Sequence, residues 1–132
     1  MNKVKEKYVS FLDEMIERYK RTFEAYNAEG RKDEAELERI KANLYELFKA
    51  LFITDTRQLE GKDLSGYKDI NLFADYLLRF DTIPANWKRF LEQARENGDV
   101  VRQTVEETKL EIVMELKDKL ISMVNEELGV NV

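Results

Sequence analysis

LERIKANLYELFKALF, residues 37–52, is the stretch of sequence that decides the fold. Large apolar side chains recur in it at steps of three and four residues, at Leu37, Ile40, Leu44, Leu47, Phe48, Leu51 and Phe52. This spacing places them on one side of an α-helix, while charged residues such as Glu38 and Lys49 fall on the other side. We expect one face of this helix to lie in a core, with Leu44, Leu47, Phe48 and Leu51 nearly fully buried.

Similar patterns on both sides of this stretch predict four further helices. The second helix is expected from Glu34 to Ile53, with Asp33 as its N-cap, and residues 54–68, which contain Gly61 and Gly66, are expected to form a connection. The other predicted helices are residues 2–28, residues 69–80 capped by Asp69, a helix that starts at Pro84 and stops at Asn97 and Gly98, and residues 100–128 between Asp99 and Gly129.

Three long helices and two short ones predict an all-α fold in a single domain that spans residues 1–132. The simplest arrangement is a four-helix-type bundle whose third position is split at Pro84, because the residue before a proline avoids helical geometry. A globin-like crossing arrangement is the competing interpretation, and the periodicity does not separate the two.

Composition restricts the classes of function. The chain has 132 residues and a net charge of −5, with no cysteine and no histidine, so the usual ligands of zinc, haem and iron–sulfur clusters are missing and we expect no cofactor. Basic residues form no stripe that could neutralise a run of phosphates, so nucleic acid is not an expected partner. Charged residues interrupt every apolar run near the N-terminus, which predicts no signal peptide, no membrane span and a cytoplasmic location.

Catalysis would depend on Asp, Glu, Lys or Tyr, since neither histidine nor cysteine is available as a nucleophile or general base. No phosphate-binding loop and no nucleophile motif accompanies the few serines and threonines. Folding can still bring two distant carboxylates together. The sequence therefore gives no support for an enzyme, and a carboxylate-based enzyme is the third of three functional hypotheses.

Four carboxylates share one side of the predicted last helix, at Glu107, Glu111, Glu115 and Asp118. In ferritin-like bundles, carboxylates ligate a metal pair together with Glu-x-x-His motifs. This chain has no histidine, so a metal site is not expected, and a solvated acidic face is the simpler interpretation. A basic surface of a partner protein is a further candidate for contact with this face.

Three phenols lie close to one line on the first predicted helix, at Tyr8, Tyr19 and Tyr26. The simpler interpretation is that their rings fill the core while their hydroxyls reach its rim or a buried partner. The alternative is a small-ligand pocket that Trp87 completes, because a few hydrogen-bonding groups in an apolar wall are typical of ligand sites. A ligand-binding bundle is the second functional hypothesis.

The last predicted helix carries two apolar stripes rather than one. Val105, Ile112, Leu116, Leu120 and Met123 form the stripe that is assigned to the core. A second stripe lies to its side and consists of Leu110, Met114, Ile121, Val124 and Leu128, interrupted by Lys117. Because something must cover this second stripe, the leading hypothesis is a protein–protein interaction or regulatory module that forms a homodimer through it, with Lys117 fixing the register. Coverage by the short helices of the same chain is the alternative.

Overall fold

The chain forms a bundle of five helices over the residues that its computed structural model describes, which are 2–57 and 73–129. In chain order the helices are α1 (Asn2–Ala28), α2 (Lys32–Thr56), α4 (Ala74–Thr82), α5 (Ala85–Glu96) and α6 (Val100–Leu128). Neither described range contains a β-strand. The predicted all-α class, with three long and two short helices, is therefore confirmed.

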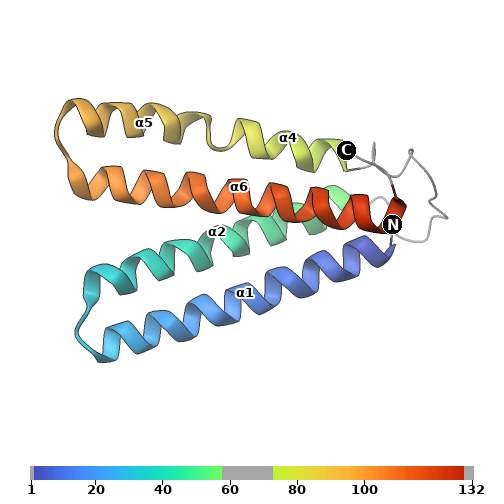
Figure 1. Cartoon of the computed structure of the whole chain (residues 1–132), viewed down its shortest axis with the longest axis horizontal. Helices are drawn as coiled ribbons and strands as arrows, with labels where there is room; N and C mark the ends of the chain where they lie inside the picture. Colours follow the sequence, from blue (N-terminus) through green and yellow to red (C-terminus); the bar gives the residue numbers. More distant parts are fainter. Residues whose placement is uncertain (1, 58–72, 130–132) are drawn as a thin grey trace.

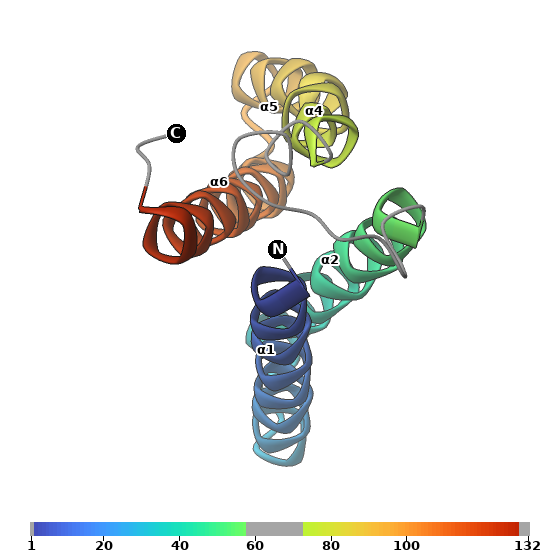
Figure 2. The same ribbon diagram turned by 90° about the vertical axis from the view of Figure 1, so that its right-hand side faces the viewer.

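Two antiparallel hairpins, α1 with α2 and α5 with α6, have their turns at the same end of the bundle (Figure 1). α4 lies in line with α5 and extends toward the opposite end, so these two helices share the third position, as predicted. The most extensive seam joins α1 and α2, and α6 contacts each of the other four helices. Toward their turns the two hairpins move apart (Figures 1 and 2). This alignment along one long axis is a bundle rather than a globin-like crossing arrangement.

The ends of α1 and α6 coincide with the predicted ends, and α6 shows why. The Asp99 carboxylate accepts a hydrogen bond from the backbone N–H of Arg102 at 3.0 Å, which satisfies one of the free amides of the first turn. At the other end, Gly129 adopts a φ of 67°, and its N–H donates to the Asn125 carbonyl at 2.8 Å. Glycine is favoured at this left-handed position because it carries no Cβ.

α2 is longer than predicted at both ends. It begins at Lys32, so Asp33 lies in its first turn and is not the N-cap. The turn after α1 ends one residue earlier, at Arg31, whose N–H donates to the Tyr26 carbonyl at 2.9 Å. At the other end, residues 54–56 belong to the helix and not to a connection. The Thr56 hydroxyl donates to the Phe52 carbonyl at 2.6 Å, and Thr56 is buried. The rest of the predicted connection, from residue 58 on, and the predicted cap Asp69 lie outside the described residues.

A break separates α4 from α5 at Ile83 and Pro84. Pro84 is the N-cap of α5, and its carbonyl accepts a hydrogen bond from the Lys88 N–H at 3.1 Å. The expected reason for the split is wrong, because Ile83 keeps helical angles (φ −65°, ψ −47°). The interruption falls instead at Pro84, which has no N–H to donate to the preceding turn. Pro84 is itself buried, which places the break against the rest of the bundle and not in solvent.

Aromatic rings fill much of the core between α1, α2 and α4. The ring centre of Phe52 lies 4.7 Å from that of Tyr8 and 4.9 Å from that of Tyr76. Phe48 stacks on Phe80 with 5.1 Å between the ring centres. The core residues on α6 are Ile112, Val113, Leu116, Leu120 and Val124.

Two of the four core predictions for α2 are wrong. Leu44 and Phe48 are buried as expected, but Leu51 is only partly buried and 42% of Leu47 is exposed. The large apolar residues alone do not mark the buried side, because two small residues, Ala35 and Ala42, are also buried there. The side chain of Glu46, next to Leu47, pairs with Lys20 of α1 at 2.7 Å. The buried side is thus rotated toward α1, and Leu47 lies at its outer edge.

Candidate functional site

A groove of about 410 Å³ opens where α4 breaks into α5 and faces one side of α6. Phe80 and Val113 are buried at its base, Leu110 is partly buried, and 66% of Met114 is exposed. The groove, here called the Pro84 groove, is lined by Phe80, Asp81, Pro84, Lys88, Leu110, Val113, Met114, Lys117 and Asp118. It is a concave surface with a mainly apolar base and charged residues on its rim.

Charges of the two signs are balanced around the Pro84 groove. The rim carries two acids, Asp81 and Asp118, and two bases, Lys88 and Lys117. Lys117 of α6 lies 3.8 Å from the carboxylate of Asp81 at the end of α4. Both side chains are more than one-third exposed, so this pair adds little to stability and is free to exchange partners.

The structure divides the predicted dimer interface. Val124 is only 5% exposed and belongs to the core, so its assignment to an outward stripe is wrong. Ile121 is partly buried, and the side chain of Leu128 lies outside the described residues. Leu110, Met114 and Lys117 do come together, and they do so on the Pro84 groove. Of the described stripe residues, Val124 is therefore covered within the chain and Ile121 is partly covered, whereas Leu110 and Met114 face the groove.

The four predicted acidic residues of α6, Glu107, Glu111, Glu115 and Asp118, are all exposed. Glu107 lies 3.7 Å from Arg95 of α5. Burial raises the pKa of the Tyr19 phenol, and the nearby charge of Glu115 raises it further. Among the residues that the structure describes, no group of three or more acidic side chains is arranged to hold a metal ion.

The predicted ligand residues do not share one site. Tyr8 and Tyr26 are eighteen residues apart on α1, which separates them by about 27 Å along the helix axis. Tyr8 is fully buried, Tyr19 packs against the Tyr45 ring at 5.4 Å, and Tyr26 lies under the guanidinium of Arg31 at 4.6 Å. Trp87 of α5 lies under the Lys109 ammonium group. Each ring therefore packs against a different neighbour.

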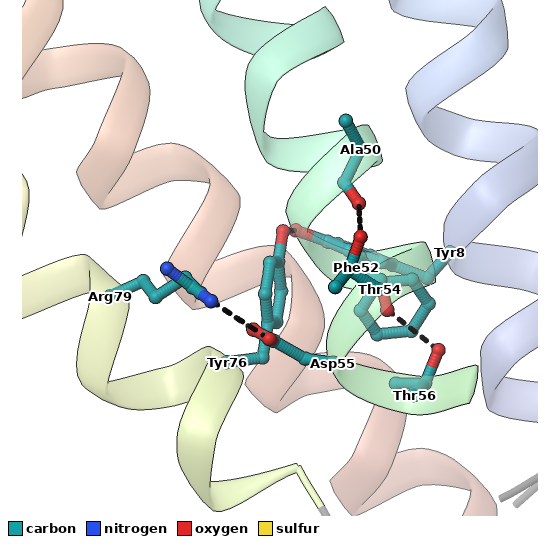
Figure 3. A network of polar contacts seen from close by, with 8 residues as sticks. All are labelled: Tyr8, Ala50, Phe52, Thr54, Asp55, Thr56, Tyr76 and Arg79. Atoms are coloured by element: carbon teal, nitrogen blue, oxygen red, sulfur yellow. Dashed lines mark hydrogen bonds and ion pairs between the residues drawn. The ribbon is translucent and has the colours of Figure 1, made fainter. Parts of the chain in front are cut away.

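A polar network that the sequence did not reveal joins α1, α2 and α4 (Figure 3). The Tyr8 and Tyr76 hydroxyls are 2.8 Å apart in the core. The Arg79 guanidinium donates two hydrogen bonds to the Asp55 carboxylate, at 2.7 and 2.9 Å. Burial raises the pKa of Tyr76, and the adjacent Tyr8 and Asp55 raise it further. Asp55 was missed because it lay in the predicted connection, and no motif marks such a pairing.

A buried carboxylate between α5 and α6 is the second feature that the sequence did not reveal. Glu106 is fully buried and accepts hydrogen bonds from Arg102 at 2.9 Å and from Lys109 at 3.3 Å. Each cation lies over an aromatic ring of α5, with Arg102 5.2 Å from the centre of Phe90 and Lys109 5.1 Å from that of Trp87. The spacing Arg-x3-Glu-x2-Lys was the available signal, but it is also typical of exposed helix faces.

Outside this network and this carboxylate, the described residues offer grooves rather than an enclosed reaction centre. No helix within the described ranges is both long enough and apolar enough to cross a membrane. No protein-family model matches the chain, and no curated protein or solved structure matches it either.

Proposed function

We propose that the protein is a protein–protein interaction module that forms a homodimer through the Pro84 groove. The observation that carries this proposal is the exposure of Met114 on a groove that also contains Leu110 and Pro84. An exposed methionine beside an apolar concave surface is typical of binding surfaces, because its flexible side chain adapts to an opposing surface.

Charge balance favours a second copy as the occupant. Each chain carries a net charge of −5, so two copies repel one another over most of their surface. The Pro84 groove is an exception, because two lysines and two aspartates surround it. In a two-fold interface the same patch meets itself, so a patch with equal numbers of acids and bases is complementary to its own copy.

The position of Lys117 sets the register of such a dimer. Its ammonium group lies beside Asp81 within one chain, and Asp118 is its neighbour in sequence. When two copies meet around Met114, Lys117 of each copy can pair with an aspartate of the other. A single polar residue in an apolar stripe fixes the register of helix pairs in this way, at some expense of affinity.

Sedimentation velocity at micromolar concentration tests the dimer. We expect the wild-type protein to sediment as a dimer and Met114→Glu to sediment as a monomer with unchanged helix content, because the side chain is exposed in the single chain and tolerates a charge there. Val101→Glu is the matched control, since Val101 is an exposed apolar residue on the same helix, outside the groove. It should remain a dimer.

Two results would contradict the proposal. One is a wild-type protein that remains monomeric at the highest concentration it tolerates. The other is a dimer that survives Met114→Glu, or that Val101→Glu dissociates equally well, because either would place the interface on another surface.

A further inference from the structure

A second groove, of about 560 Å³, lies between α1 and α6. It contains Phe11 of α1 and Met123 of α6, whereas the Pro84 groove lies between α6 and the α4–α5 break. The end-on view places α1 and the α4–α5 pair on different sides of α6 (Figure 2). The two surfaces are therefore separate, and a partner in one does not occupy the other.

Phe11 and Met123 are partly buried apolar side chains that pack against the core from this groove. Three carboxylates surround them: Glu6 and Glu14 on α1, and Glu126 on α6. Glu6 and Glu14 are eight residues apart, which spaces them by about 12 Å, or two helical turns. The groove thus presents a short apolar surface with acids on both sides.

Each lysine of this groove lies close to another side chain, whereas its three acids have no ion-pair partner among the residues that the structure describes. The Lys7 ammonium group lies 3.3 Å from the Glu127 carboxylate, and that of Lys119 lies 5.1 Å from the centre of the Phe11 ring. No ion pair joins Glu6, Glu14 or Glu126 to another of the described residues. With three acids and two lysines the lining of the groove is negative on balance, and its acids stand on either side of the apolar surface.

We infer that the groove between α1 and α6 binds a basic amphipathic helix of another protein. Apolar residues at helical spacing on such a helix would contact Phe11 and Met123, and flanking lysines or arginines would pair with Glu6, Glu14 and Glu126. Binding of an amphipathic helix along a groove is a recurrent mode of recognition, and opposite charges on the two surfaces raise the association rate and set the orientation. A second copy is a poor occupant because its own surface is acidic overall.

The probe is a fluorescein-labelled 14-residue peptide with leucines on one helical face and lysines elsewhere, measured by fluorescence anisotropy at physiological salt. The test variant combines Glu6→Lys, Glu14→Lys and Glu126→Lys, all at exposed positions. The matched control combines Glu24→Lys, Glu96→Lys and Glu111→Lys, which changes the net charge equally at exposed positions outside the groove. We expect the test variant to weaken binding by at least about tenfold and the control by less than about threefold, because opposed charges matter most at contact distance.

A peptide of the same composition, scrambled so that its leucines no longer share a face, separates groove binding from general attraction to an acidic protein. It should bind more weakly than the ordered peptide. Backbone amide shifts of the wild-type protein, which need no variant, should change most near Ser10 and Ser122, two further residues of the groove. The inference is overturned if the wild-type protein does not bind the ordered peptide, if both triple variants lose affinity equally, if the scrambled peptide binds as well, or if the shifts cluster at Glu107, Glu111 and Glu115 of α6 instead of at the groove.

Discussion

Three phenols in the core, Tyr8, Tyr45 and Tyr76, give the fold a dependence on alkaline pH. Burial raises the pKa of each one, since the charged phenolate is poorly solvated there. Unfolded chains release these protons at about pH 10, whereas the folded chain retains them. The contribution of these phenols to the free energy of unfolding is therefore fully present below about pH 10 and is lost as the pH rises above it.

We expect the free energy of unfolding to fall by about 1.4 kcal/mol per pH unit for each such tyrosine above pH 10. Urea titrations between pH 9 and pH 11 measure this slope. Tyr76→Phe has one phenol fewer, so its stability should fall less steeply with pH than that of the wild-type protein. Equal slopes for the two proteins would show that Tyr76 ionises as easily in the folded chain as in the unfolded one.

Glu106 is a buried carboxylate that two cations of its own helix contact. It is fully buried and accepts hydrogen bonds from two cations, so Glu106→Gln keeps the shape but weakens both bonds. Hydrogen bonds to charged groups contribute about 1.5 to 3 kcal/mol, and we expect a loss of that size in the free energy of unfolding. Glu111→Gln, at an exposed position on the same helix, should cost less than about 0.5 kcal/mol. Equal losses in urea titrations would mean that the Glu106 charge has no net effect.

At the level of the helix, the buried side of α2 is the feature that the periodic pattern located least well. Phe48 is fully buried, whereas 42% of Leu47 is exposed. Phe48→Ala should cost about 3 to 5 kcal/mol in the free energy of unfolding, as a large core ring usually does. Leu47→Ala should cost less than about 1 kcal/mol. Chemical denaturation measures both losses. If the two variants lost similar stability, Leu47 would have to lie in the core or in an interface with a second copy.

Helix positions could be predicted from the sequence because their signals are local. Asp99 and Gly129 fix the ends of α6 through hydrogen bonds within a few residues, and Pro84 breaks the third position through its own backbone. The end of α2 could not be predicted, because Asp55 is held in the helix by Arg79, twenty-four residues away. Only part of the Pro84 groove could be predicted from the sequence. Leu110, Met114 and Lys117 were identified by their stripe, but Phe80 and Pro84, which complete the groove, come from another element.

At the level of the whole molecule, burial is uneven along the bundle. The buried residues of α1 are Val4, Tyr8, Leu12 and Ile16, and no described residue of this helix after Ile16 is buried. This less buried part of α1 leads to the turn, where the two hairpins move apart (Figure 1). On α1 the most deeply buried apolar residues therefore lie away from the hairpin turn.

Native-state hydrogen exchange should reveal this gradient. Amides between Leu12 and Ile16 can exchange only when the core opens, whereas those between Thr22 and Tyr26 need only local separation of α1 from α2 near the turn. We expect protection factors at least about tenfold higher in the first segment, even though both segments are continuous helix. Equal protection would mean that α1 and α2 open as one unit. Stronger protection near the turn would mean that a partner or a second copy covers the diverging hairpins, which would move the dimer interface away from Met114.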